Sequence, residues 1–132
     1  MTILTLARGL PGSGKSTFAQ SLGCFHVEDD MFRIRDGKYF FNWQDGISPG
    51  MICELVTGTI LKTGNDVVVS NAFVTMEEMN RYFLLARQTN AKVRVVKCTA
   101  RWRPRHEMDR QVIEIMREQW EDYEGEEVWD GQ

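Results

Sequence analysis

The chain has 132 residues, of which 42% are hydrophobic and 27% are charged, and its formal net charge at pH 7 is −3. These values fit one ordinary globular domain, exclude disordered, collagen-like and low-complexity proteins, and argue against a protein that coats nucleic acid non-specifically, because such proteins are usually basic. No apolar run approaches the roughly 18 residues of a membrane span, and the N-terminus lacks the pattern of a signal peptide, so we expect a cytoplasmic protein without a membrane partner.

The first half of the chain alternates short apolar strands with helical stretches. A buried strand is predicted over residues 3–7, a helix over 16–22, a short strand over 25–28 and a helix over 50–62. Gly64-Asn65 ends this last helix. Its apolar stripe, which we expect to face the core, comprises Met51, Ile52, Leu55, Val56, Thr59 and Ile60.

The second half repeats this alternation. Val67-Val68-Val69 predicts a strand buried on both faces. Thr75, three residues before Glu78, is typical of a capping box at the start of a helix that ends near Asn90. A strand over 93–98 and a polar loop lead to a last helix, for which Asp109 is the predicted N-cap. The two helices have apolar faces that comprise Met76, Met79, Tyr82, Phe83 and Ala86 in the first, and Val112, Ile113, Ile115, Met116 and Trp120 in the second.

The three cysteines, Cys24, Cys53 and Cys98, are widely spaced and form no metal-binding motif, so we interpret them as reduced core residues. Neither a repeat nor a linker interrupts the chain. We therefore expect residues 1–132 to form a single domain, in which an acidic tail over 121–132 is prone to fray.

A complete GxxxxGK[ST] motif connects the first strand to the first helix. Its glycines permit positive φ angles, so that successive N–H groups converge on a phosphate. Lys15 is placed to neutralise the outer phosphates, and the Ser16 hydroxyl suits Mg²⁺. The motif therefore predicts binding of ATP with Mg²⁺ by Gly9, Pro11, Gly12, Ser13, Gly14, Lys15, Ser16 and Thr17. With the strand–helix alternation, it predicts an α/β fold of three layers, the P-loop NTPase fold, with helices on both faces of a parallel sheet of about four to five strands.

The strand over 67–69 lacks the acid that many P-loop proteins carry at its end. It continues as Ser70-Asn71-Ala72-Phe73, and Asp66 lies at its start, far from the expected phosphate site. GTPases and motor ATPases use an Asp at this place to help hold Mg²⁺. The sequence therefore argues against these two classes.

The segment Glu28-Asp29-Asp30 follows the second predicted strand. Ligands of open α/β sheets bind beyond the carboxyl ends of the strands. We therefore expect Asp29 or Asp30 to deprotonate an acceptor hydroxyl, and the alternative for Asp30 is to cap a helix. Arg33 is a candidate to bind a phosphate of the acceptor or to pair with an acid.

The loop after the last predicted strand is basic and carries Arg101, Arg103 and Arg105 at alternate positions. Guanidinium groups suit the negative charge of a transferring phosphoryl group, so the loop is a candidate lid over the triphosphate. A solvated basic loop is the alternative. Within it, Trp102 is suited either to stacking on a base or to buried anchoring.

Several segments, in this order, resemble the kinase domain of the 5′-polynucleotide kinase family and the wider group of zeta-toxin-like P-loop ATPases. They are the motif over 9–16, Asp29-Asp30, Lys38-Tyr39, residues 45–51 and Val68-Val69-Ser70-Asn71. The resemblance implies transfer of phosphate from ATP to a 5′-hydroxyl of DNA or RNA. It implies Asp29 as the general base, Arg33 as an acceptor contact, and Arg101, Arg103 or Arg105 as the lid arginine. The lid is shorter than in that family, and Asn71-Ala72-Phe73 replaces its Asp-Thr-Asn.

The foremost hypothesis is a kinase with Lys15, Asp29, Arg33 and Arg103 as catalytic residues, Arg101 and Arg105 at the nucleotide, and a 5′-hydroxyl nucleic acid end as acceptor. Phe41, Trp43 and Phe73 are candidates for stacking on the end nucleotide or for core packing. One alternative is a small-molecule kinase that acts on a nucleoside or sugar. Another is a non-catalytic ATP-binding protein that contacts a partner.

Overall fold

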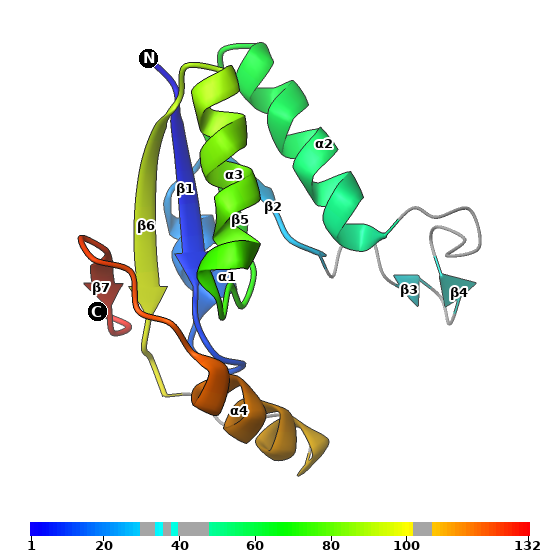
Figure 1. Cartoon of the computed structure of the whole chain (residues 1–132), viewed down its shortest axis with the longest axis vertical. Helices are drawn as coiled ribbons and strands as arrows, with labels where there is room; N and C mark the ends of the chain where they lie inside the picture. Colours follow the sequence, from blue (N-terminus) through cyan, green and yellow to red (C-terminus); the bar gives the residue numbers. More distant parts are fainter. Residues whose placement is uncertain (30–33, 36–37, 40–47, 102–106) are drawn as a thin grey trace.

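The computed structural model describes residues 1–29, 34–35, 38–39, 48–101 and 107–132, and Figure 1 shows the course of the chain. Five parallel strands form one sheet in the order β2-β5-β1-β6-β7. Their bounds are β1 Ile3–Arg8, β2 Phe25–Val27, β5 Val67–Ser70, β6 Lys92–Cys98 and β7 Glu127–Trp129. A separate antiparallel pair joins β3 (Ile34–Arg35) to β4 (Lys38–Tyr39). The predicted parallel α/β sheet is confirmed.

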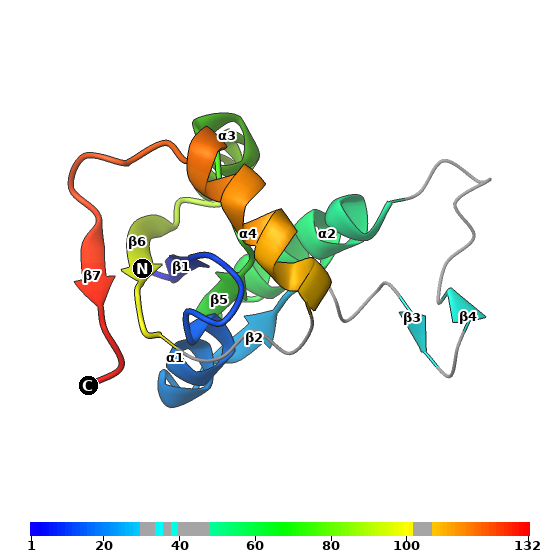
Figure 2. The same cartoon turned by 90° about the horizontal axis from the view of Figure 1, so that it is seen from below.

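Helices cover both faces of the sheet, as expected. Their bounds are α1 Lys15–Ser21, α2 Pro49–Lys62, α3 Met76–Gln88 and α4 Glu107–Gln119. Helix α1 packs on one face through Phe18 and Ala19, which contact Val68 and Val96 in one core cluster. Helices α2 and α3 pack on the other face, where they bury the larger cluster around Leu6. In Figures 1 and 2, α4 lies instead below the carboxyl ends of the strands, across the edge that carries the glycine-rich loop.

The inner face of α2 differs from the predicted stripe. Cys53, Thr57 and Gly58 are buried, whereas Leu55 is 70% exposed. The reason is close packing of α2 on α3: a Cβ at Gly58 would lie only 3.1 Å from Leu85 Cδ1. A hydrophobic pattern finds large apolar residues, but here small residues form the contact because they let the two helices approach closely.

Thr75 is the N-cap of α3 as predicted, although Glu78 bonds the N of Val74 rather than that of Thr75, and the cap predicted at Asp109 of α4 is wrong. Thr75 Oγ1 accepts a hydrogen bond from Glu78 N at 3.4 Å, while Glu78 Oε2 accepts one from Val74 N at 2.7 Å. Helix α4 begins at Glu107, so Asp109 lies within its first turn and is not its N-cap. None of the helices in the described part of the chain has the length and the apolar stretch that crossing a bilayer requires.

The C-terminal segment, for which the sequence predicts fraying, contacts the core in the structure. Strand β7 pairs with β6 through Lys97↔Val128 and Cys98↔Trp129, and the Trp129 ring lies 5.5 Å from that of Phe18. Glu126, the residue before β7, accepts a hydrogen bond at 3.0 Å from the fully buried Arg8 through its Oε1. The acidic residues of this segment therefore include a partner of a buried cation, which a frayed tail would leave unpaired.

Candidate active site

The glycine-rich loop leaves β1 at Gly9 and enters α1 at Lys15. Gly12 and Gly14 have φ angles of 81° and 85°, a region that glycine adopts without steric cost. Gly9 has no room for a side chain, because a Cβ there would overlap Ser13 Oγ and lie 2.7 Å from the Cys98 carbonyl oxygen. These positions require glycine for two distinct reasons: backbone conformation at Gly12 and Gly14, and close packing at Gly9.

Hydrogen bonds from the neighbouring strand ends fix the loop. Gly9 N donates to Ala72 O at 3.2 Å, and Ala100 N donates to Ser13 O at 3.2 Å. The ammonium of Lys15 spans the loop, with Gly9 O at 2.9 Å and Leu10 O at 3.1 Å. A positive charge is thus held against the loop whose N–H groups are expected to bind a phosphate.

Ser16, the candidate Mg²⁺ ligand, lies against the end of β2. Its Oγ donates to Glu28 Oε2 at 3.0 Å, and Ser70 Oγ donates to the same oxygen at 2.9 Å. The register explains this meeting, because Val27 pairs with Val69 and the next residues of the two strands are therefore neighbours. His26 Nε2 lies 3.6 Å from Glu28 Oε2 and within hydrogen-bond distance of Ser70 Oγ.

Asp29, the candidate base, is held in place by the end of β5. Its backbone N donates to Asn71 Oδ1 at 2.9 Å, and Asn71 Nδ2 donates to Asp29 Oδ1 at 3.2 Å. Asn71 Nδ2 also lies 3.9 Å from the Cys53 sulfur, and burial together with the nearby Asp29 charge raises the pKa of that thiol. Asn71 therefore orients the Asp29 carboxyl group, a role that the sequence did not reveal because it depends on the pairing of β2 with β5.

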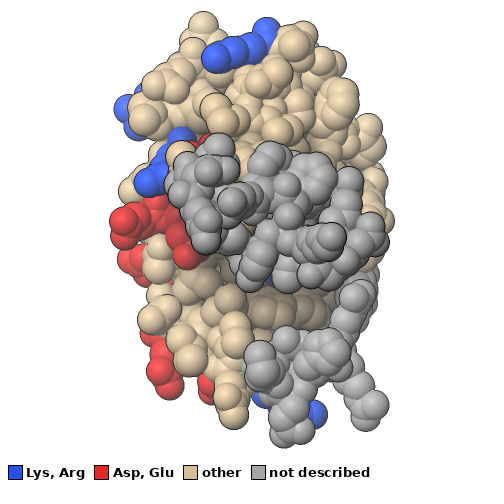
Figure 3. All heavy atoms as spheres, turned by 90° about the vertical axis from the view of Figure 1, so that its right-hand side faces the viewer, with Lys and Arg blue, Asp and Glu red and all other residues tan. Residues whose placement is uncertain are grey.

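The predicted residues on the acceptor and lid sides are only partly described. Arg101 follows β6 and is exposed, whereas Asp30, Arg33, Phe41, Trp43, Trp102, Arg103 and Arg105 lie outside the described residues. Phe73 is 3% exposed and packs edge-on against Tyr82 with ring centroids 5.4 Å apart, so it is a core residue and does not stack on a nucleotide. Figure 3 shows the side of the molecule where β3 and β4 lie, and described Asp and Glu side chains gather along one margin of it.

Mg²⁺ and ATP fit the donor set of this site. Mg²⁺ prefers oxygen ligands and commonly combines one or two carboxylates with substrate phosphates. The Ser16 hydroxyl and the Glu28 carboxylate supply such oxygens, 3.0 Å apart, at the first turn of α1. Within the described ranges, Ser13 Oγ is a buried polar atom without a hydrogen-bond partner, and it belongs to the same loop. A bound phosphate is a group that could satisfy a hydroxyl at this place.

The three cysteines are unequal in their environment. Burial raises the pKa of the Cys53 thiol from its ordinary 9.0 to about 12. Burial also raises the pKa of Cys98, to about 11, although the nearby Lys15 acts in the opposite direction. Burial and the charge of Asp66 raise the pKa of Cys24, which is only half-buried. All three thiols are therefore expected to stay protonated at neutral pH.

We expect iodoacetamide at pH 8 to alkylate Cys24 first and to leave Cys53 and Cys98 intact until the chain unfolds, as measured by mass spectrometry.

Because folding favours the neutral thiols, their contribution to stability is complete below pH 9.0 and is lost as the pH rises towards about 12. Urea unfolding at pH 8 and 10.5 checks the sign of this effect. Rapid alkylation of Cys53 in the native protein would contradict the burial.

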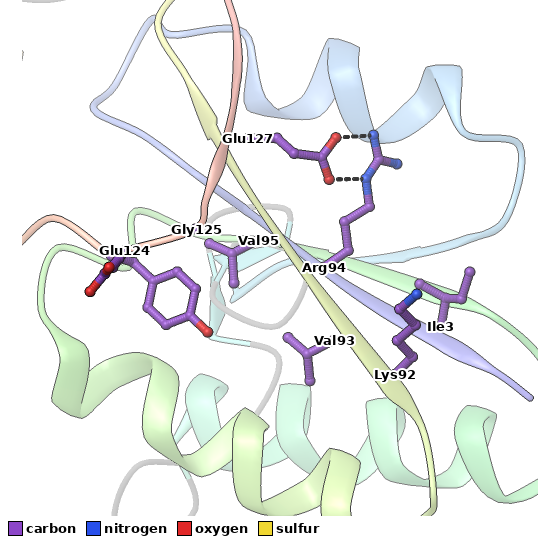
Figure 4. Close-up of a pocket in the computed structure, with 9 residues that line it drawn as sticks. Ile3, Lys92, Val93, Arg94, Val95, Glu124, Gly125 and Glu127 are labelled. Carbon is purple, nitrogen blue, oxygen red and sulfur yellow. Dashed lines mark hydrogen bonds and ion pairs between the residues drawn. The ribbon is translucent and has the colours of Figure 1, made fainter.

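A cavity of about 360 Å³ lies away from the glycine-rich loop, at the outer edge of the sheet (Figure 4). It is lined by Ile3 at the start of β1, by residues 92–95 of β6 and by the segment before β7. Arg94 closes one side through two hydrogen bonds to Glu127, at 2.6 and 2.9 Å. Because the strands end at the opposite edge, this cavity is separate from the candidate active site.

Comparison with known proteins places this site in a family. A family model described as an AAA domain matches residues 4–111, which include the loop, β2 and β5. Among curated proteins we find no significant match.

Solved structures share the fold at low identity. One from Chloroflexus aurantiacus j-10-fl is 21% identical, with a TM-score of 0.61, over 75% of this chain and 60% of that chain. A sugar kinase from Janibacter sp. HTCC2649 is 15% identical, with a TM-score of 0.63, over 98% of this chain and 86% of that chain. A chain of the Pnkp1/Rnl/Hen1 RNA repair complex is 20% identical, with a TM-score of 0.60, over 74% of this chain and 33% of that chain. This likeness shows the fold alone, and two of the three chains are much longer than their match.

Proposed function

The chain belongs to the AAA domain family, and from this premise we propose that it is an ATP-dependent kinase, which transfers the γ-phosphoryl group of ATP to a hydroxyl acceptor. The observation that carries the proposal is the hydrogen bond of 3.0 Å between Ser16 Oγ and Glu28 Oε2. It brings the end of β2, with Asp29 as the next residue, against the phosphate-binding loop. A kinase needs this arrangement, because its donor phosphate and its acceptor hydroxyl must meet at one edge of the sheet.

Each of the residues around this contact has a separate role in the proposed reaction. Lys15 and the loop N–H groups would hold the β- and γ-phosphates. Asp29 would accept the proton of the acceptor hydroxyl, whose oxygen attacks the γ-phosphorus while the bond to the bridging oxygen of ADP breaks. Arg33, Arg101, Arg103 and Arg105 are candidates to contact acceptor or transferring phosphate. Mg²⁺, held by Ser16, would lower the negative charge of the β- and γ-phosphates.

The first candidate acceptor is the 5′-hydroxyl of a DNA or RNA end. Its support is the order of motifs along the sequence, together with the structural likeness to a chain of an RNA repair complex. The phosphate next to a 5′-terminal nucleoside is an anion. Arg33 follows Asp29 closely in the sequence and is our candidate to bind this phosphate.

The second candidate acceptor is a small molecule such as a nucleoside or a sugar. Two observations favour it: the sugar kinase matches almost the whole of this chain, and the chain carries a formal net charge of −3. A polyanionic strand would be repelled by a protein of net negative charge, whereas an uncharged sugar would not.

A panel of acceptors tests the proposal. The chain is incubated with Mg²⁺ and γ-labelled ATP and with 5′-hydroxyl DNA, 5′-hydroxyl RNA, nucleosides or sugars, and Lys15→Ala serves as the blank. We expect label on a 5′-hydroxyl oligonucleotide. The rate of label transfer should be lower by about 10²-fold or more in Lys15→Ala, because this variant lacks the ammonium group that would stabilise the charge of the transferring phosphoryl group.

The other outcomes of this panel are decisive as well. Label on nucleosides or sugars alone would support the second acceptor and reject the first. Tight ATP binding without turnover dependent on any acceptor would reject the kinase and leave a non-catalytic ATP-binding protein.

A further inference from the structure

The carboxylate missing from the end of β5 is supplied by the neighbouring strand. In P-loop NTPases, Mg²⁺ is commonly held by the hydroxyl of the loop and by an Asp at the end of a second strand. Here β5 ends at Ser70, which bears only a hydroxyl. The Ser70 Oγ donates its proton to Glu28 Oε2 at 2.9 Å, so that a carboxylate from β2 lies at the end of β5.

The hydrogen bond between Ser16 and Glu28 leaves the Ser16 oxygen suited to a cation. A serine hydroxyl has one proton to donate and two lone pairs that accept. The proton of Ser16 is committed to Glu28 Oε2 at 3.0 Å, so its lone pairs remain for another group. Because the acceptor of this bond is a carboxylate, the bond also increases the negative charge on the Ser16 oxygen. Both effects strengthen an oxygen as a ligand of Mg²⁺.

The position of Glu28 is fixed from three sides. Ser16, Ser70 and His26 surround the same carboxylate oxygen, while the side chain of Glu28 is 25% exposed on its open side. His26 Nε2 also lies within hydrogen-bond distance of Ser70 Oγ, so the three side chains form one connected set around Glu28. The chain thus orients Glu28 by a set of bonds that a merely solvated surface acid would not have.

Within the described residues, no group of three or more His, Cys, Asp or Glu side chains is placed to hold a metal ion. Phosphates of a nucleotide and water are suited to supply further oxygens to a cation at Ser16 and Glu28. We therefore expect the site to bind a metal–nucleotide complex more tightly than the metal alone.

We propose that Glu28 is the metal-orienting carboxylate of this chain and that it selects Mg²⁺-ATP over free ATP, directly or through a water ligand of the metal. The proposal rests on the proposed binding of ATP at the loop but not on any acceptor. It assigns to β2 a role that other P-loop proteins give to an Asp on the strand equivalent to β5.

Calorimetric titration with ATP, in Mg²⁺ and in excess EDTA, tests this assignment. We expect Glu28→Gln to weaken Mg²⁺-ATP binding by about 10–100-fold, the range typical of groups that orient metal ligands. Binding of free ATP should stay the same or tighten, because the substitution removes a negative charge near the phosphates. Glu77→Gln, which removes an exposed carboxylate on α3, is the matched control and should change neither affinity.

A second variant moves the carboxylate to β5. In Glu28→Gln/Ser70→Asp the acid stands where other P-loop proteins have it, and we expect the Mg²⁺-ATP affinity to recover part of the about 10–100-fold loss caused by Glu28→Gln. Electron paramagnetic resonance of Mn²⁺ with ATP reports the same change at the metal, without any enzymatic turnover.

Equal weakening of ATP binding with and without Mg²⁺, or no change in either, would overturn the proposal. If Glu28→Gln does not fold, as judged by thermal unfolding, Glu28→Asp takes its place, and we expect a weaker loss restricted to Mg²⁺-ATP. Because no acceptor is present, a kinase panel without any labelled product would leave this result standing, so failure of the two proposals can be distinguished.

Discussion

Replacing Arg8 by alanine is expected to lower the free energy of unfolding by about 3–5 kcal/mol, the cost of removing one partner from a buried ion pair. The side chain of Arg8 is 0% exposed, and that of its partner Glu126 is 10% exposed. Without the guanidinium, the Glu126 carboxylate would remain in the interior without its cation. Urea unfolding followed by circular dichroism measures the change.

Arg8 also donates to backbone carbonyl groups of two distant segments. Its Nε and Nη2 donate to Phe73 O at 3.0 and 2.7 Å, and Nη2 also donates to Glu121 O at 2.7 Å. The guanidinium carbon lies 4.1 Å from the centre of the Trp120 ring, which adds a cation–π contact. One side chain thus joins the end of β1, the loop after β5 and the segment after α4.

The loop after β5 depends on this side chain in a further way. Phe73 has a φ angle of 47°, a left-handed conformation that is unfavourable for a bulky residue by roughly 1–2 kcal/mol. The two hydrogen bonds from Arg8 to the Phe73 carbonyl hold the residue in this conformation. Since Arg8 directly precedes Gly9, we expect its loss to weaken ATP binding as well.

Arg94→Ala is the matched control for Arg8→Ala. Arg94 makes a bidentate pair with Glu127, but the two side chains are 39% and 52% exposed, so we expect a loss of at most about 1 kcal/mol. Arg8→Met/Glu126→Gln removes both buried charges and should be less destabilised than Arg8→Ala. A loss below about 1 kcal/mol for Arg8→Ala would show that the buried pair contributes little.

Asp29→Asn is expected to reduce acceptor-dependent phosphoryl transfer by about 10²–10⁴-fold, the usual contribution of a general base. An amide has nearly the shape of the carboxyl group but cannot accept the proton of the acceptor hydroxyl. The Asn71 side chain accepts from the backbone N of residue 29 and donates to its Oδ1, so it should hold the amide in the same place. ATP binding should therefore change little, and calorimetry checks this while labelled ATP measures the transfer rate.

Two comparisons decide whether Asp29 itself is the base. Asp30→Asn replaces the other acid that the sequence allows for this role, and it should retain most of the transfer activity. Asn71→Ala leaves the Asp29 carboxylate but removes its support, and we expect a smaller loss of kcat than Asp29→Asn causes, with ATP binding unchanged. If Asp30→Asn is inactive while Asp29→Asn is active, Asp30 is the base and Asp29 a structural residue.

The architecture and the loop were predictable from the sequence because their signals are local. Three consecutive valines predict the buried strand β5, and Thr75 with Glu78 predicts the start of α3. The glycine-rich motif is equally local, because its function depends on backbone conformations within a few successive residues. The prediction of ATP binding is therefore independent of how distant segments pack.

The supports of the candidate site were not predictable in this way. Ser70 meets Glu28 across 42 residues of sequence, and Arg8 meets Glu126 across 118. The sequence shows that each pair includes a polar residue at or near the end of a predicted strand, as Arg8 is after an apolar strand. It does not show which residues they contact, because the contacts depend on the order and register of the strands.

The amino-acid sequence by itself determined the strand–helix alternation, the phosphate-binding loop and the segment Glu28-Asp29 that follows β2. Only the tertiary structure decided that Glu28 contacts Ser16 and that the acidic C-terminal segment neutralises Arg8. The physical reason is that hydrophobic period and glycine conformation act over a few residues, whereas a hydrogen bond or ion pair between side chains exists only once the sheet has brought distant strand ends together.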